Sequence, residues 1–156
     1  MKQCCYDSPI GKLFIKEDNG EITNLYFGWV DNFETQEQTE STVLKKAIEQ
    51  LEEYFLGKRK EFDLPLNPQG TEFQQKAWTA LTKIEFAKTK TYSQIAQEIG
   101  SPKGARAVGL ANNKNPIPII IPCHRVIGAN GALTGFRGGL DAKQYLIEHE
   151  KKHALL

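Results

Sequence analysis

Proline spacing constrains residues 115–126 more than any other part of this 156-residue chain. The stretch reads NPIPIIIPCHRV, with prolines at 116, 118 and 122 around a run of three isoleucines. A proline disfavours helical backbone at the residue before it and has no amide hydrogen of its own to donate. We therefore expect an extended, non-helical segment with buried isoleucines, which presents Cys123 from a rigid support.

The two residues at the exit of this segment, Cys123 and His124, place a thiol beside an imidazole. Only the thiolate is strongly nucleophilic, the ordinary thiol pKa is about 8.5, and a nearby base is needed to activate it. Neighbouring side chains of an extended chain point to opposite sides, so we expect a bridging water rather than a direct bond. A buried structural cysteine is the alternative interpretation.

The cysteine count and the apolar runs indicate the compartment. Three cysteines, an odd number, argue against a disulfide framework, and the N-terminus has no apolar signal-peptide core. The longest apolar run is far too short to span a bilayer. The sequence therefore predicts a cytoplasmic protein without a membrane anchor, in which Cys123 is a free thiol.

The net charge of +1 conceals two halves of opposite sign. Residues 1–70 carry eight Lys and Arg against thirteen Asp and Glu, whereas residues 71–156 carry twelve against six. Seven basic residues and the single acid Glu98 lie between Phe86 and Leu140. A basic half of this kind favours a polyanionic partner, most commonly nucleic acid.

Alternating and helical patterns divide the first half. Residues 11–17 and 22–30 are expected to form two strands, joined by a tight turn at Asn19-Gly20. Apolar residues at helical spacing between Ser41 and Gly57 predict one helix. Prolines and a glycine then mark a connector. We place the domain boundary there, with a first domain at 1–66 and a second at 67–156.

The second half is predicted to be mainly helical. One helix begins near Thr71, and two short helices joined by a tight turn follow, which is typical of a helix-turn-helix. Gly100 ends the first helix of this pair. Ser101 is expected to cap the second, which spans 102–112 and is rich in small residues.

A last helix is expected to begin at Asp141 and Gln144, which resemble a capping box, and to run to about Lys152. The acidic stretch 34–40 reads as a solvated loop. Together these patterns predict an α+β protein with a small sheet-plus-helix N-terminal lobe and a mainly helical C-terminal lobe.

The PCHRV motif closely resembles the active-site signature of the methylated-DNA–protein-cysteine methyltransferases, the O6-alkylguanine-DNA alkyltransferases. The resemblance covers most of 71–150, and SPIGKL near the N-terminus matches more faintly. It implies a ribonuclease-H-like N-terminal lobe. The matching stretches, in the family's order, are TEFQQKAW, YSQIA, ARAVG, NPIPIIIPCHRVIG, TGFRGGL and LIEHE.

This resemblance also implies roles for individual residues. Cys123 would accept the alkyl group, His124 would deprotonate it through a water, and Glu150 would orient His124. Tyr92 would donate a proton to the departing guanine, and Arg106 would replace the extruded nucleotide in the base stack. The residues implied in binding the base and the DNA are Asn115, Val126, Phe136, Arg137 and Gly138.

The implied activity is direct repair of double-stranded DNA by a methyltransferase that acts once. The protein would flip O6-alkylguanine out of the duplex and transfer its alkyl group irreversibly to Cys123, as a monomer and without a cofactor. No His occurs before position 124, so a zinc site around Cys4 and Cys5 is not expected. Two departures stand out: Phe136 where the family usually has Tyr, and Ala87 where Gly is common.

Three other functions remain open at this point. An alkyltransferase-like binding protein would flip the same lesion but lack the acceptor cysteine, which this chain has. A Cys/His hydrolase would require turnover and an oxyanion hole, and would leave the helix-turn-helix unexplained. A transcriptional regulator would require a helix with side chains that read base edges, and the small residues of 102–112 offer few.

Overall fold

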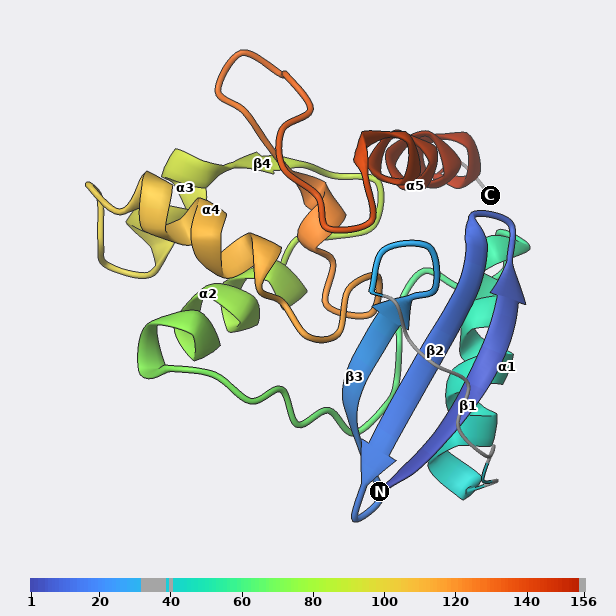
Figure 1. Ribbon diagram of the computed structural model, residues 1–156. Coiled ribbons are helices and arrows are strands. Elements are labelled where there is room, and N and C mark those ends of the chain that lie inside the picture. Colours follow the sequence, from blue (N-terminus) through green and yellow to red (C-terminus); the bar gives the residue numbers. More distant parts are fainter. Residues whose placement is uncertain (32–38, 40, 155–156) are drawn as a thin grey trace. The chain divides into compact units, whose positions relative to one another are not determined.

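The computed structural model describes residues 1–31, 39 and 41–154, and two compact units divide the chain at Gln69 and Gly70. The N-terminal unit is a three-stranded antiparallel sheet with one helix, and the C-terminal unit is mainly helical (Figure 1). The predicted α+β class is therefore confirmed. Apart from Thr39, the acidic stretch 34–40 lies outside the described residues.

The sheet has the order β1-β2-β3, with strands Lys2–Ser8, Gly11–Asp18 and Glu21–Phe27. The turn between β2 and β3 has positive φ at both Asn19 and Gly20, 51° and 82°, as the sequence predicts for a tight hairpin. These two residues therefore set the register of the central strand pair.

Two features of the sheet differ from the prediction. The first strand, β1, carries its buried residues side by side, at Gln3 and Cys4, so it lacks the alternation that identifies a strand. The third strand ends at Phe27 rather than at Val30. The Phe27 amide donates to the Asp31 carboxylate at 2.7 Å and its carbonyl closes a turn, so the chain leaves β2 after Gly28, whose amide still donates to the carbonyl of Lys12.

Helix α1, Thr42–Phe55, packs on one face of this sheet (Figure 1). The Ser41 hydroxyl caps it by accepting from the Leu44 amide, and Gly57 with φ of 78° follows its end, as predicted. The connector then returns along β3, where Ile22 pairs with Leu66. This pairing holds the connector within the N-terminal unit.

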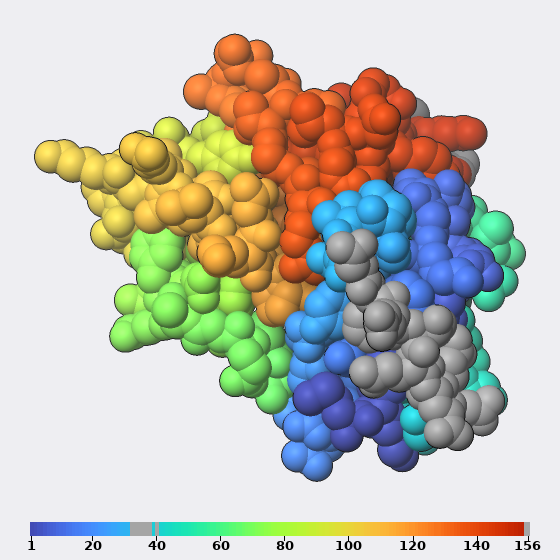
Figure 2. Space-filling model, in the orientation of Figure 1, coloured from blue at the N-terminus to red at the C-terminus, as the bar shows by residue number. Residues whose placement is uncertain are grey.

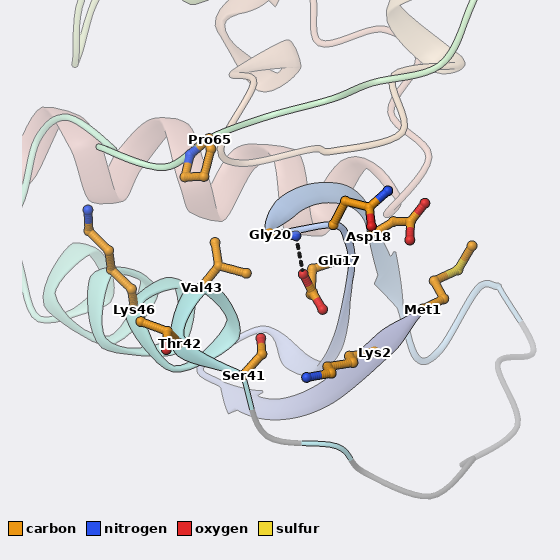
Figure 3. A pocket seen from close by; sticks show the side chains of 11 residues that line it. Met1, Lys2, Glu17, Asp18, Gly20, Ser41, Thr42, Val43, Lys46 and Pro65 are labelled. Atoms are coloured by element: carbon orange, nitrogen blue, oxygen red, sulfur yellow. Dashed lines mark hydrogen bonds between the residues drawn. The ribbon is translucent and has the colours of Figure 1, made fainter.

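A pocket of about 690 Å³ lies in the N-terminal unit, where the turn after β2 faces the start of α1 (Figure 3). Charged groups of both signs line it, and the Gly20 amide donates to the Glu17 carboxylate at its edge. None of its lining residues belongs to the set that the sequence analysis assigns to chemistry. Its lining residues include Lys2, Glu17, Asp18 and Lys46.

The described part of the C-terminal unit has four α-helices: α2 (Glu72–Thr82), α3 (Tyr92–Glu98), α4 (Ala105–Asn113) and α5 (Leu140–His153). Full capping boxes fix the starts of α2, at Thr71 with Gln74, and of α3, at Thr91 with Gln94. The Trp78 indole donates to the carbonyl of Ala111 at 2.8 Å and so joins α2 to α4. Helices α3 and α4 form the predicted helix-turn-helix.

Two helix starts differ from the prediction. Helix α4 begins at Ala105 rather than at 102, because Ser101 closes a turn with Gly104 and its amide completes the end of α3. Helix α5 begins at Leu140 after Gly139, whose φ is 95°. Among the described residues no side chain caps α5, so the capping box expected at Asp141 is not formed.

Residues 115–126 have the buried isoleucines that the prolines predict, because Ile117, Ile119, Ile120 and Ile121 are all at most 6% exposed. The expectation of a wholly non-helical segment is wrong at its end. Cys123–Arg125 forms one 3-10 turn, η1, directly after Pro122, which can precede a helical turn without loss of a hydrogen bond. The chain then enters β5 (Val126–Ile127), which pairs in parallel with β4 (Lys90–Thr91).

Candidate active site

Asn115 braces the backbone that leads to Cys123. Its side-chain amide donates to the carbonyl of Ile121 at 2.8 Å, and its oxygen accepts from the amide of Ile117 at 3.0 Å. Both bonds are buried, and Asn115 itself is 2% exposed. The turn that carries the thiol is therefore held at a fixed position, with Cys123 only 4% exposed.

His124 and Glu150 form a fully buried pair. Nε2 of His124 lies 2.6 Å from Oε2 of Glu150. Burial opposes the charge of Glu150, but His124 and Arg125 favour it and lower the pKa of this carboxyl, whereas burial lowers the pKa of His124 against the effect of Glu150. A carboxylate can only accept, so Nε2 carries the proton and the lone pair of a neutral ring is on Nδ1.

Nδ1 of His124 is the atom that could accept a proton from the thiol. It is buried and has no hydrogen-bond partner in the part of the chain that the structure describes. The residue that follows Cys123 in the sequence is therefore a neutral base, and its Nε2 is fixed by the carboxylate of Glu150.

Arg125 lies on the same turn and completes the environment of Glu150. Its Nε and Nη2 donate to the two carboxylate oxygens at 2.8 and 3.1 Å, and its Nη1 donates to the carbonyl of Ile84 at 2.6 Å. The amide of Ala87 adds a fourth donor to Glu150 at 3.1 Å. Because guanidinium and carboxylate are both buried, this bidentate pair keeps Glu150 charged.

The surroundings of Cys123 disfavour the thiolate in the free protein. Burial raises the pKa of Cys123 above its usual value, while a side-chain hydrogen bond with Asn115 and the charges of Lys143 and Arg137 act in the opposite direction. Desolvation disfavours the thiolate more than these groups favour it. The thiol is therefore protonated at neutral pH, and a base is needed to remove its proton.

Lys143 is a buried cation on α5. It is fully buried, and its Nζ donates to the carbonyls of Val126 and Thr134, each at 2.7 Å. Burial lowers the pKa of Lys143 to about 8, against the effect of Cys123. These two bonds join the end of β5 to the loop that precedes α5 and place a positive charge near the thiol.

Tyr92 opens α3 and is bonded to the same loop. Its hydroxyl donates to the carbonyl of Thr134 at 3.1 Å, so Tyr92 and Lys143 share one acceptor. Further along the loop, Phe136 and Gly138 are buried and Arg137 is half-buried. Of these predicted loop residues, Arg137 lies close enough to Cys123 for its charge to act on the thiol.

Arg106 lies apart from this buried cluster, on the exposed face of α4. It lines a pocket of about 460 Å³ together with Tyr92, Leu110, Asn113 and other residues of α3, α4 and the loop. Figure 2 shows the exposed surface of α4 and of the loop after β5 on one face of this unit. Arg106 is therefore accessible to a large ligand that binds on the outside of α4, and it does not belong to the cluster around the thiol.

The seven basic residues counted between Phe86 and Leu140 are not equally accessible. Arg125 is buried in its ion pair, Lys90 pairs with Glu98, and Arg137 is half-buried beside the thiol. The four that are exposed are Lys88, Lys103, Arg106 and Lys114.

Three residues of the site are absent from the sequence-based set: Asn112, Arg125 and Lys143. A spacing signal exists for two of them. Lys143 falls three residues before Leu146 and seven before Glu150, on the buried face of α5. Asn112 falls four residues after Val108 on the buried face of α4, and its Nδ2 donates to the carbonyl of Cys123 at 3.2 Å.

No helix in the described residues is long and apolar enough to cross a membrane. In the same part of the chain, no group of three or more His, Cys, Asp or Glu side chains is placed to hold a metal ion.

Comparison with known proteins gives matches along nearly the whole chain. Residues 72–152 match the 6-O-methylguanine DNA methyltransferase DNA binding domain, and residues 1–68 match the ribonuclease-like domain of the same family. The methylated-DNA–protein-cysteine methyltransferase of Methanosarcina acetivorans is 45% identical over 96% of this chain and 98% of its own. The constitutive enzyme of that name from Bacillus subtilis is 47% identical over 93% and 92%.

A solved structure matches the fold as closely. The crystal structure of Mycobacterium tuberculosis OGT in complex with DNA has a TM-score of 0.91 and 44% sequence identity, and the match covers 98% of this chain and 94% of that one. With both domains matched and relatives at this identity over most of their length, the chain belongs to the 6-O-methylguanine DNA methyltransferase family.

Proposed function

We propose that this protein repairs O6-alkylguanine in double-stranded DNA by transferring the alkyl group to its own Cys123. One observation carries the proposal: on a single 3-10 turn, a buried thiol directly precedes a buried imidazole that a charged carboxylate orients. Family membership supports the reaction, and the presence of Cys123 favours transfer over lesion binding alone.

The first step is removal of the thiol proton. Cys123 is protonated at neutral pH because burial raises its pKa, and Nδ1 of His124 is the available lone pair. The proton passes to His124 through a bridging water, because Cys123 and His124 are neighbours on a 3-10 turn, where successive side chains point in different directions. Glu150 stabilises the imidazolium that forms, and Lys143 stabilises the thiolate.

The second step is displacement at a saturated carbon. The sulfur of Cys123 forms a bond to the alkyl carbon while the bond from that carbon to O6 breaks, and the electron pair goes to the purine. Guanine leaves poorly as an anion, so a proton donor is needed, and we assign this to Tyr92. Its hydroxyl is bonded to the carbonyl of Thr134 in the free protein, and it exchanges this acceptor for a ring nitrogen of the base.

The lesion must leave the base stack to reach a buried thiol. Extrusion of a nucleotide costs a few kcal/mol, and a side chain that fills the gap offsets part of this cost. We assign this role to Arg106, which is exposed on α4 and lines the same pocket as Tyr92. Glycines and small residues on α4 let its backbone approach DNA closely.

The extruded base docks next to Cys123. We assign the contacts with the base to Val126, Phe136, Arg137 and Gly138, and the support of the thiol turn to Asn115. All of these groups come from one unit of one chain, so the proposed reaction needs no second copy, and we infer that the protein acts as a monomer.

A repair assay tests this function directly. A duplex that contains one O6-methylguanine is incubated with excess protein, and its nucleosides are then separated. The wild type should convert the lesion to guanine, and Cys123→Ser should leave it unchanged while binding the duplex with similar affinity. Conversion by Cys123→Ser would contradict the assignment of the acceptor.

A further inference from the structure

Asn112 contacts the backbone of the acceptor residue from α4. Its Nδ2 donates to the carbonyl oxygen of Cys123 at 3.2 Å, and its side chain is almost fully buried, with the residue 3% exposed. This bond fixes which side of the amide faces Cys123, because a flipped amide would place an oxygen against the carbonyl. With Nδ2 fixed toward the carbonyl of Cys123, Oδ1 must point to the other side of the amide group.

That oxygen is a buried acceptor whose pairing is incomplete in the free protein. Among the described residues, Oδ1 of Asn112 has no hydrogen-bond partner. Buried amide oxygens are nearly always paired, because losing water without gaining a protein partner weakens a fold. A site that binds a ligand is one place where such an atom is kept, since the ligand supplies the donor.

The proposed lesion has one donor that matches. Alkylation of O6 removes the hydrogen from N1 of guanine, so the exocyclic 2-amino group is the only N–H donor left on the base. A base whose alkyl carbon reaches the sulfur of Cys123 lies next to the Cys123 backbone, and Asn112 is bonded to that backbone. Alkylated thymine, by contrast, has no N–H donor.

We propose that Asn112 is a specificity-determining residue, whose Oδ1 accepts a hydrogen bond from the 2-amino group of the flipped O6-alkylguanine. The inference rests on the proposed function, because it requires the base to dock at Cys123. It predicts preference for guanine lesions over O4-alkylthymine, since an alkylated thymine would leave the oxygen buried and unpaired. A site built around one hydrogen bond rejects an analogue that lacks it.

The test compares two lesions that differ in this amino group alone. Single-turnover rate constants are measured with excess protein on duplexes containing O6-methylguanine or O6-methylhypoxanthine, which lacks the 2-amino group. The wild type should prefer O6-methylguanine by about tenfold to a hundredfold. Asn112→Leu keeps the size of the side chain without its polar atoms and should reduce this ratio to about one.

The ratio separates recognition from support of the fold. Loss of the bond to the Cys123 carbonyl would slow both lesions equally and cancel in the ratio. Gln3→Leu is the matched control, because Gln3 is a buried amide of the N-terminal unit whose Oε1 also lacks a partner in the described residues. It should keep the wild-type ratio.

An unchanged ratio in Asn112→Leu would overturn the proposal, and so would a wild type that repairs both lesions at equal rates. Asn112→Ala provides the same comparison if the leucine variant does not fold. Failure of the proposed function is distinct, because the wild type would then repair neither lesion.

Discussion

Arg125 and Glu150 form a buried, two-bond ion pair, with Nε–Oε1 and Nη2–Oε2 distances of 2.8 and 3.1 Å. The same carboxylate accepts from Nε2 of His124 and from the amide of Ala87. One side chain of α5 therefore fixes the imidazole, the 3-10 turn and the segment before β4. Activation of the thiol and stability of the fold therefore both depend on the hydrogen bonds that the Glu150 carboxylate accepts from these four N–H groups.

Replacement of this carboxylate should reduce both stability and rate. Glu150→Gln leaves Arg125 buried without a counter-charge, which we expect to lower the free energy of unfolding by about 3 kcal/mol. It also removes the group that orients His124, so alkyl transfer should slow. His124→Ala should slow it too, and the double variant should lose less than the sum of the two effects. Denaturant unfolding and single-turnover rates measure these losses, and strictly additive losses in rate would contradict a shared role.

The buried ion pair of Arg125 and Glu150 also determines how the free energy of unfolding changes as the pH falls. The pKa of Glu150 is lowered in the folded state, so its contribution to stability is complete above the unfolded value of about 4.3 and is lost as pH falls through the folded value. Urea unfolding at a series of pH values should show this loss in the wild type. In Glu150→Gln the free energy of unfolding should decline less steeply over the same pH range. Parallel curves for the two proteins would show that Glu150 does not cause the loss.

Lys143 should matter for the thiol through its charge. Lys143→Met removes the cation near Cys123 and leaves the carbonyls of Val126 and Thr134 without this donor. We expect alkyl transfer at pH 7 to slow by about tenfold, roughly the effect of one pKa unit on a thiolate. Lys143→Arg keeps the charge and should lose less. Equal losses in the two variants would assign Lys143 a packing role only.

Ala87 occupies backbone that favours glycine, with φ of 65°. Left-handed backbone costs an L residue about 1–2 kcal/mol, and glycine adds about 0.5–1 kcal/mol of unfolded-state entropy, so Ala87→Gly should stabilise the fold by up to about 1.5 kcal/mol. Gly100→Ala is the matched reverse change, at φ of 78° in open space, and should destabilise it by a similar amount. Thermal unfolding measures both, and a destabilised Ala87→Gly would show that this turn is not strained.

DNA affinity should depend on salt less steeply than the basic count suggests. Four exposed cations between Phe86 and Leu140 imply a slope of log K against log salt of about −3.6, rather than the value of about −6 expected from all seven. Arg106→Ala should reduce this slope and should impair repair in duplex DNA more than reaction with a free O6-alkylguanine base. Equal loss on the two substrates would contradict a role of Arg106 in extrusion.

The features that the sequence predicts well depend on neighbours within a few residues. The Asn19-Gly20 turn requires two positive φ angles, Ser41 caps the helix that follows it, and the buried isoleucines follow from proline spacing. The start of α4 is harder to predict, because Ser101 suits a helix cap but its backbone is already used to close α3.

The features that it does not predict depend on distant partners. The pKa of Cys123 is raised because the whole unit closes over it, which no local pattern reports. Arg125 belongs by composition to a basic surface, yet it is buried because Glu150, 25 residues later, and the carbonyl of Ile84 accept hydrogen bonds from its guanidinium. Residue type thus identifies the thiol and the base, whereas tertiary contacts decide their protonation.

Cys123 should accept one alkyl group irreversibly, and titration with methylated duplex followed by mass spectrometry measures this transfer. A thioether at Cys123 is a stable carbon–sulfur bond, and its hydrolysis would require a water activated to attack a saturated carbon, so guanine restored should equal the amount of protein and should not increase with time. The intact protein should gain one methylene, located on the peptide that contains Cys123. More than one lesion repaired per chain, or a methyl group on Cys4 or Cys5 instead, would contradict the account.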